Sequence, residues 1–484
     1  MKKKSLSVNA VLNMIRTALS VIFPLITFPY ISKVLSIDNV GRYNFAYSVI
    51  TYFQLFAALG INTYAIREGA KLRADYVKIS QFASEVFSIN VLSTGIAYIA
   101  LGIAILIVPQ FQGYGPLLFI LSGVIITTTL GCEWVYSIYE EYLYITIRSI
   151  LAYIFSLILL FTLVKQPNDI LNYAIVTTVA TGGANLLYVY SRKKYCNIKF
   201  LWNHKDIYIQ KHIKSILMIF GNTVTTNIFV NSGVLLLGFL STEYHVALYS
   251  VSSKVYAVVK NLLAAVIIVS VPRLSNYWGT GKKDLFKQIL NQIFIALISL
   301  VLPAVIGLMV LSKEIILLIS NENYLPAQNS LVILCIALIL SIFNWFFTSC
   351  ILIPTKNEKK VFRTTSICAV VNICINCICI PIIQENAAAI ATVFAEGIGM
   401  LISFHYAKEF FYPFIKKRDL ISVIVGNILI VIICLICKNY IDTLYIRIGI
   451  AIILSVFVYG LALILLKNTI LCNGLKSLKQ IIKK

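Results

Sequence analysis

The chain has 484 residues, a formal net charge of +22 and an apolar fraction of 59%, while only 12% of its residues are charged. Soluble globular proteins carry about 25% charged residues, so this composition excludes an ordinary soluble domain and predicts a polytopic membrane protein. The cations are spread along the chain and are not gathered in one domain. We therefore expect membrane lipids, and no nucleic acid, as the partners of these basic residues.

Fourteen apolar segments follow one another, each close to the length of about 20 residues that a transmembrane helix needs. They lie at 11–35, 40–66, 83–108, 115–138, 142–164, 170–191, 213–240, 245–272, 285–310, 325–353, 364–384, 386–407, 420–437 and 445–466. The predicted fold is all-α, with about 14 transmembrane helices. No small-residue cleavage site follows the first segment, so we expect it to remain as an uncleaved span.

Basic residues alternate between the two sides of these spans. Thirty of the 41 Lys and Arg residues lie in every second connection, whereas the connections between them hold only Lys165, Lys313 and Lys438. The basic segments are 2–4, 67–80, 192–214, 273–284, 354–363, 408–419 and 467–484. Cationic loops are translocated poorly, so the basic side is predicted to be cytoplasmic, with both termini inside.

A short sequence pattern recurs about six spans apart. Leu-Ser-Ile-Asp-Asn-Val-Gly-Arg-Tyr-Asn at 35–44 parallels Leu-Ser-Thr-Glu-Tyr followed by Val-Ala-Leu-Tyr-Ser at 240–250, if His245 is an insertion. Many transporters consist of such repeated halves, although chance similarity between two short apolar stretches is the alternative. We predict two pseudo-symmetric six-helix bundles, 1–195 and 196–410, followed by a helix pair and a basic cytoplasmic tail at 411–484.

Polar residues recur at helical spacing on four of the predicted helices, and each series marks one helix face. The members that we expect to line a polar cavity and bind substrate are Arg16 on the first helix, Asn44 on the second, Asn227 and Asn231 on the seventh, and Asn261 on the eighth. The structural alternative is hydrogen bonding between helices, which Ser, Thr and Asn often provide in membranes.

Charged residues deep in the apolar spans are costly, so they indicate a function. Lys254 and Lys260 lie near the middle of the eighth span, and Glu396 lies near the middle of the twelfth. Lys254 shares a helix face with Asn261, so we expect it to point into the cavity, with Lys260 as a second cation. Glu396 is predicted either to bind a coupling ion, H⁺ or Na⁺, or to form a structural ion pair with Lys254 or Lys260.

Charges near the predicted cytoplasmic ends of the second, fourth and fifth spans form a second group. Its members are Arg67, Glu68, Glu133, Glu140, Glu141 and Arg148. We predict a cytoplasmic gate or a structural clasp, because intramembrane charges usually pair. The cysteines at 374–379 and 434–437 have metal-like spacing, but no His or carboxylate is adjacent to them, so we predict packing roles and neither a metal site nor a cofactor.

Several motifs in chain order resemble those of the Wzx-type polysaccharide repeat-unit flippases, members of the multidrug/oligosaccharidyl-lipid/polysaccharide exporter superfamily. They are Phe-Pro-Leu-Ile-Thr-Phe-Pro-Tyr at 23–30, Tyr-Ala-Ile-Arg-Glu at 64–68, Glu-Trp at 133–134, Glu-Glu-Tyr at 140–142, Tyr-Ile-Thr-Ile-Arg-Ser at 144–149 and Pro-Arg-Leu-Ser at 272–275. The stretch 135–138, Val-Tyr-Ser-Ile, departs from the aromatic pair plus Gln-Gly usual in that family.

This resemblance implies alternating access around a central cavity between two six-helix bundles. It implies transport of undecaprenyl-pyrophosphate-linked oligosaccharide units across the bacterial inner membrane for O-antigen or capsule synthesis, with a polymerase and a chain-length regulator as partners. A multidrug or small-molecule antiporter of the same superfamily is the alternative, but deep cations outnumber deep carboxylates here. A membrane glycosyltransferase is less well supported, because the sequence has no Asp-x-Asp motif or nucleotide-binding loop, so we do not expect an enzyme.

Overall fold

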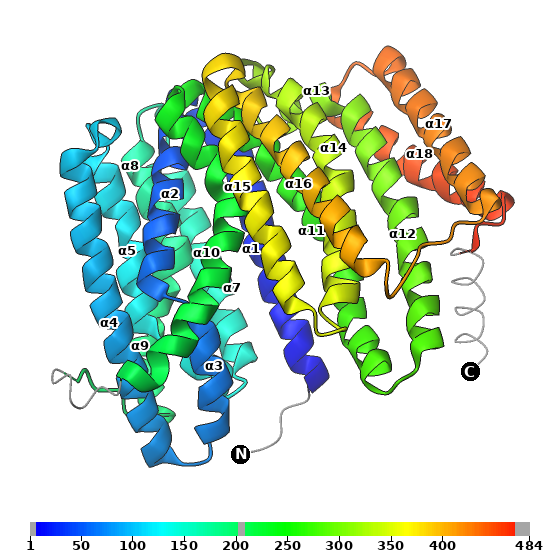
Figure 1. Ribbon diagram of the computed structural model, residues 1–484. Helices are drawn as coiled ribbons and strands as arrows, with labels where there is room; N and C mark the ends of the chain where they lie inside the picture. Colours follow the sequence, from blue (N-terminus) through cyan, green and yellow to red (C-terminus); the bar gives the residue numbers. More distant parts are fainter. Residues whose placement is uncertain (1–5, 202–208, 470–484) are drawn as a thin grey trace. The chain divides into compact units, whose positions relative to one another are not determined.

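A computed structural model describes residues 6–201 and 209–469, and all regular elements in these ranges are helices (Figure 1). The first ten α-helices are α1 Leu6–Val34, α2 Ile37–Ala58, α3 Ile61–Leu72, α4 Tyr76–Ile107, α5 Gly115–Gly131, α6 Glu133–Ile138, α7 Tyr142–Leu163, α8 Ile170–Thr178, α9 Ala184–Ser191 and α10 Ile209–Leu240. The others are α11 Glu243–Gly279, α12 Lys283–Val310, α13 Ser312–Ile319, α14 Ala327–Trp345, α15 Glu358–Ile383, α16 Glu385–Ala407, α17 Lys417–Tyr440 and α18 Leu444–Leu465. The predicted cytoplasmic position of the two termini concerns residues outside the described ranges.

The predicted all-α membrane fold is confirmed, because 13 helices of the described chain are long and apolar enough to cross a bilayer. The fourth predicted span, 115–138, is divided into α5 and α6. Cys132 between them has a φ of 48°, in the left-handed region that interrupts an α-helix. The 17 residues of α5 are at the short end of the lengths that span a bilayer.

Two other predicted spans in the first half of the chain are also interrupted. The second is divided into α2 and α3 at Gly60, which has a φ of +72°. The sixth contains a π-helical turn, Val179–Gly183, between α8 and α9. Such turns widen a helix locally and are frequent at functional sites. These interruptions lie close to the polar pocket described below.

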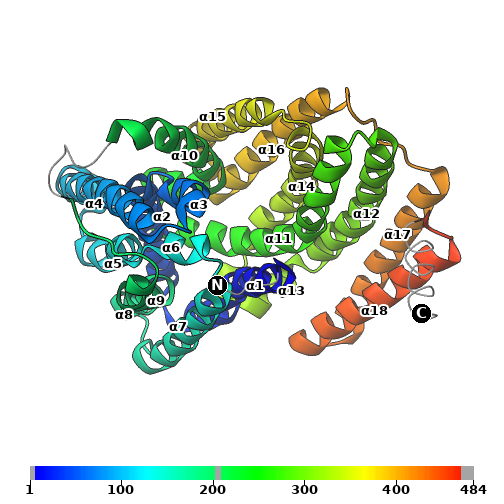
Figure 2. The same ribbon diagram turned by 90° about the horizontal axis from the view of Figure 1, so that it is seen from below.

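The chain forms two compact units, 1–247 and 248–484. In the first unit, α2 packs against α4, α5 and α10, while α1 packs against α7 and α3 against α6. In the second, α16 packs against α14 and α15, and the α17–α18 hairpin packs against α12 (Figures 1 and 2). The predicted boundaries near 195 and 410 remain predictions, although α10, which we expected to open the second bundle, packs within the first unit.

The start of α2 packs closely against the end of α10 and the first residue of α11 within the first unit. A Cβ atom on Gly41 would lie 1.8 Å from the carbonyl oxygen of Glu243. A Cβ atom on Gly238 would lie 1.9 Å from the ring of Phe45. These segments can approach each other this closely because Gly41 and Gly238 lack a side chain.

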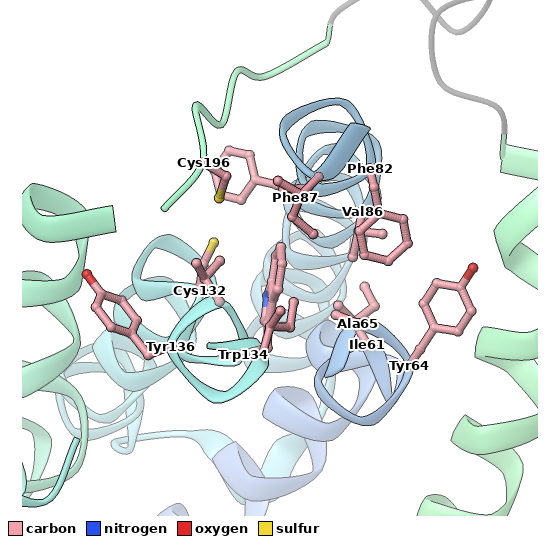
Figure 3. Close-up of a cluster of buried hydrophobic side chains, with 14 of the residues drawn as sticks. Ile61, Tyr64, Ala65, Phe82, Val86, Phe87, Cys132, Trp134, Tyr136 and Cys196 are labelled. Atoms are coloured by element: carbon pink, nitrogen blue, oxygen red, sulfur yellow. The ribbon is translucent and has the colours of Figure 1, made fainter. Parts of the chain in front are cut away.

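A buried hydrophobic core joins α3, α4 and α6 (Figure 3). Figure 3 shows Trp134 in the middle of this core, with the α4 side chains on one side and Cys132 on the other. Cys196 closes the core from the chain that follows α9, and burial raises the pKa of its thiol to about 11. The core holds α6 in a fixed position, and Glu133 is the first residue of that helix.

Candidate functional site

A polar cavity of about 460 Å³ lies within the first unit. It is lined by residues of α1, α3, α4, α5, α6 and α7, by the last residue of α2, and by the π-helical turn with the start of α9. Three of its lining residues are charged, namely Arg16, Glu133 and Arg148. Ligand pockets combine such a small set of charged or polar groups with a larger neutral wall.

Arg16 and Arg148 share the carboxylate of Glu133. The distance from Arg16 Nη2 to Glu133 Oε1 is 2.5 Å, and the distance from Arg148 Nη2 to Glu133 Oε2 is 3.3 Å. Each oxygen therefore has its own guanidinium. Two cations and one carboxylate give the triad a net charge of +1, which attracts anions into the cavity.

The two arginines differ in their exposure and in the number of contacts that each makes with the protein. The Arg148 side chain is only 4% exposed, and its Nη1 donates to the Ala184 carbonyl and, over 3.2 Å, to Asn185 Oδ1. Its guanidinium also lies 3.3 Å from the centre of the Tyr188 ring. The Arg16 side chain is 34% exposed. Arg16 is thus the cation that a ligand can reach, while Arg148 fixes Glu133.

The rest of the cavity wall is rich in neutral hydrogen-bonding and aromatic groups. They include Ser20, Asn62, Asn90, Thr128, Ser149, Thr181 and Asn185, together with Trp134 and Tyr153. Asn90 donates to the carbonyl of Ala57 over 2.9 Å, which orients its amide. Amides and hydroxyls can both donate and accept, as recognition of sugar hydroxyls requires.

The predicted polar stripes are only partly found at this cavity. Arg16 and Ser20 line it, but Asn44 is buried elsewhere in α2 and its amide donates to the Val40 carbonyl of the same helix over 2.8 Å. Asn227 and Asn231 share one face of α10 and hydrogen-bond to each other over 3.2 Å. Both contacts lie within one helix, so neither is the hydrogen bond between helices that was the structural alternative.

Asn261 is exposed on α11. The binding roles of Asn44, Asn227, Asn231 and Asn261 remain predictions.

The predicted gate residues separate into three local groups. Glu68 accepts from Arg67 over 2.9 Å and from Lys71 over 2.6 Å. Arg73 reaches Glu140 over 2.7 Å, which joins the end of α3 to the turn before α7. The carboxylate that pairs with Arg148 is that of Glu133, because the break at Cys132 directs the start of α6 toward α7.

The gate or clasp role of these residues, Glu141 included, remains a prediction. Glu141 directly precedes the first residue of α7.

In the second unit, Glu396 forms an ion pair with Lys260, with 2.8 Å between Lys260 Nζ and Glu396 Oε1. Asn344 donates to the other carboxylate oxygen over 3.0 Å, and Ser403 donates to Asn344 over 2.8 Å. Lys260 is therefore the cation paired with Glu396, a choice that the sequence left open, and the coupling-ion role of Glu396 remains a prediction. Lys254 is half-buried on the same helix, and its substrate contact remains a prediction.

Two buried titratable residues were missed by the sequence analysis. Glu85 lies near the start of a predicted span, and His212 lies in a segment predicted as a basic connection. Both are buried, at 2% and 1% exposure, and their side chains are 2.7 Å apart. The position of His212, two residues from the end of that connection, is the only sequence feature we find that could have indicated its burial in the helix that follows. Within the described ranges, no group of three or more His, Cys, Asp or Glu could hold a metal ion.

The fold is that of a known class of transport proteins. It matches the lipid II flippase MurJ with a TM-score of 0.74 and 17% identity, over 95% of this chain and 100% of that one. A second family model, MatE, matches residues 218–378.

The model of the polysaccharide biosynthesis protein family matches residues 6–278, more than half of the chain, and the chain belongs to this family. The predicted membership of the Wzx-type branch of the exporter superfamily is thereby confirmed.

The chain is also similar to individual proteins of this kind. A putative O-antigen transporter of Shigella dysenteriae is 25% identical over 262 residues, which are 53% of this chain and 64% of that protein. The probable low-salt glycan biosynthesis flippase Agl15 of Haloferax volcanii is 24% identical over 177 residues, 37% of each chain. The chain thus matches less than two thirds of the length of these relatives.

Proposed function

We propose that this protein moves undecaprenyl-pyrophosphate-linked oligosaccharide units from the cytoplasmic to the outer face of a bacterial inner membrane. The names of the O-antigen transporter and the glycan flippase support a lipid-linked oligosaccharide as the substrate class. The shared fold with the lipid II flippase is compatible with the same kind of movement. The product would feed synthesis of a surface polysaccharide such as O-antigen or capsule.

The observation that carries this proposal is the net positive Arg16–Glu133–Arg148 triad in a pocket of neutral polar groups. A pyrophosphate that leaves water needs cations to replace its hydration, and the planar guanidinium of arginine suits phosphate oxygens. Arg16 would make this contact, because its side chain is one-third exposed. Glu133 would then remain paired with Arg148.

The sugar would occupy the neutral part of the same cavity. Asn62, Asn90 and Thr128 provide hydrogen-bonding groups, and Trp134 and Tyr153 provide aromatic surfaces. Transport requires the cavity to open alternately to the two sides of the membrane. The polyisoprenoid chain can stay in the bilayer during this step, because only the polar headgroup needs a polar path.

The second unit contains an apolar cavity of about 680 Å³, lined mainly by α12, α17 and α18. It offers a surface for part of a polyisoprenoid chain, since apolar burial there would cost no hydrogen bonds. A polymerase and a chain-length regulator are the proposed protein partners, and both termini are proposed to be cytoplasmic.

An ion-coupled multidrug antiporter is the second candidate, and the MatE match over 218–378 favours it. Such a protein binds cationic drugs, which a triad with a net charge of +1 would repel. The two candidates are separated by purified protein in proteoliposomes. We expect the protein to move a defined lipid-linked oligosaccharide from one leaflet to the other, so that it becomes accessible at both membrane surfaces. We expect no export of a cationic dye. Dye export without movement of the lipid would contradict the proposal.

A further inference from the structure

Buried carboxylates in the described chain differ in the charge that compensates them. Glu396 has Lys260, and Glu314 has both Lys438 and Arg447 within 3.6 Å. Asp419 accepts hydrogen bonds from Thr469. Glu85 is paired with His212, whose imidazole is cationic only after it binds a proton. Its charge balance therefore depends on a proton.

Glu85 and His212 belong to a chain of hydrogen bonds across three helices. His212 Nε2 on α10 lies 2.7 Å from Glu85 Oε2 on α4, and His212 Nδ1 lies 2.6 Å from the hydroxyl of Tyr64 on α3. Gln81 donates to the other oxygen of Glu85 over 3.0 Å. The rings of Tyr64 and Phe82 pack edge-on against the imidazole, and both lie on the same side of the core in Figure 3.

The segment before α10 is attached to α4 by a row of serine hydroxyls. The backbone N–H groups of Asn197, Lys199 and Leu201 donate to Ser80, Ser84 and Ser88 over 3.0, 3.0 and 2.8 Å. The serines are spaced four residues apart on α4, about 6.0 Å along the helix, and the N–H groups are spaced two residues apart, about 6.6 Å along an extended chain. The two spacings are similar, so each N–H group meets a serine. This row holds the incoming chain beside Glu85.

Protonation changes both the charge and the hydrogen bonds of this cluster. With a neutral imidazole, Tyr64 donates to Nδ1, and Glu85 is left as a buried anion with only neutral donors. With an imidazolium, Nδ1 donates to Tyr64 and Nε2 donates to Glu85, so the buried pair is neutral overall. Burial of an uncompensated ion is costly, whereas a hydrogen-bonded pair is tolerated.

The other titratable groups near this cluster are exposed, locally paired or, for Tyr139 and Cys196, buried in the same core. They are Arg67, Glu68 and Lys71 on α3, Lys78 on α4, Lys211 and Lys214 on α10, Lys199 in the preceding segment, and Tyr139 and Cys196 in the same core. Glu68 is neutralised by Arg67 and Lys71. None of these groups replaces His212 as the partner of Glu85.

We propose that Glu85, His212 and Tyr64 form a proton-binding site that holds the amino-terminal end of α10 against α3 and α4, and that couples transport to a proton gradient. The protonated pair holds α10 in place. Loss of the proton leaves Glu85 ionised, so the end of α10 separates from α4 and water reaches the carboxylate. The coupling role rests on the proposed function, whereas the binding of the proton does not.

The first test measures the proton site without any substrate. The chain has four histidines, so ¹⁵N-histidine spectra of the full-length protein in nanodiscs can be assigned by loss of one signal in His212→Gln. We expect the His212 signal to report both the neutral and the cationic imidazole as the pH is varied over the range in which the protein stays folded, and this change to be altered in Glu85→Gln. A His212 signal with one ionisation state over this range, or with no response to Glu85→Gln, would overturn the proposal.

The second test measures coupling as the ratio of flipping rates with and without an imposed pH gradient. Glutamine can donate to Glu85 and accept from Tyr64 but cannot ionise, so His212→Gln should reduce this ratio to one. For the wild-type protein we expect a ratio of about five or more, because coupling between two sites typically changes an equilibrium by at least about fivefold. The exposed His405 provides a matched control, and His405→Gln should keep the wild-type ratio.

A wild-type ratio retained by His212→Gln would overturn the coupling. If the wild-type protein flips no lipid-linked oligosaccharide at all, the proposed function fails, and the proton site is then decided by the ¹⁵N titration alone.

Discussion

Arg16 and Arg148 share the carboxylate of Glu133, yet only Arg16 is open to a ligand. Arg148 is 4% exposed and is held by two further acceptors and the Tyr188 ring, whereas a third of the Arg16 side chain is exposed. Glu133 therefore occupies the position on Arg16 that a phosphate would need. An anion that binds to Arg16 as proposed would compete with it.

This competition predicts a gain of affinity when Glu133 loses its charge. In Glu133→Gln the net charge of the triad rises from +1 to +2, while the amide oxygen can still accept from Arg148. We expect the Kd for a lipid-linked pyrophosphate to fall about fivefold, the equivalent of about 1 kcal/mol for a partly exposed ion pair. Glu68→Gln, at an exposed pair outside the cavity, should leave the Kd unchanged. Equal or weaker binding by Glu133→Gln would contradict this role.

Arg148 is predicted to be a structural residue. Its removal leaves the Ala184 carbonyl and Asn185 without their donor and leaves Glu133 with one cation. Breaking such a buried pair costs about 3–5 kcal/mol, so Arg148→Ala should lower the Tm of the detergent-solubilised protein strongly. Arg16→Ala should lower it much less. Equal Tm values for both variants would show that Arg148 is not the anchor.

The Lys260–Glu396 pair gives a test by double substitution. Lys260→Met or Glu396→Gln alone strands one buried charge and should destabilise the protein by about 3–5 kcal/mol. The double variant should recover most of the folded protein, because no unpaired charge remains. Lys254→Met should fold normally if Lys254 contacts substrate. Folded yields that fall additively in the double variant would rule out the pair as a structural element.

Gly41 and Gly238 are predicted to tolerate no side chain. Gly41→Ala would place a Cβ 1.8 Å from the Glu243 carbonyl oxygen, a backbone atom that cannot rotate away. We expect a loss of about 1–3 kcal/mol from this overpacking, measured by thermal unfolding. Gly95 and Gly102 on α4 have no neighbouring atom within 4 Å of an added Cβ, so Gly95→Ala and Gly102→Ala should be neutral or slightly stabilising. Unchanged stability of Gly41→Ala would contradict the close approach.

Most of the helices could be predicted from the sequence, because the hydropathy of a span and the basic residues that flank it are both properties of one short segment. The sequence did not predict the break at Cys132, because the positive φ falls on a cysteine, which rarely adopts it, and the adjacent Gly131 is of a type that is common in transmembrane helices. This break brings Glu133 to Arg16 and Arg148. These three residues were assigned to two different predicted groups because they are far apart in the chain.

The partner of Glu396 shows a similar limit. Lys254 and Lys260 lie about 120° apart around one helix, so spacing alone could not choose between them. The structure selects Lys260. His212 was missed for a different reason, because a histidine at the end of a basic connection looks exposed until its neighbour Glu85 is known.

The most direct test of the account is the binding of a lipid-linked pyrophosphate to Arg16 variants in nanodiscs. Arg16→Ala should lose binding by about tenfold or more, since a charge-assisted contact to phosphate is worth about 1.5–3 kcal/mol. Arg16→Lys should recover part of it, because lysine keeps the charge without the planar fork. Arg42→Ala, at an arginine that binds the Gly113 carbonyl outside the cavity, is the matched control and should bind as wild type. Wild-type affinity in Arg16→Ala at equal folded yield would contradict the central claim.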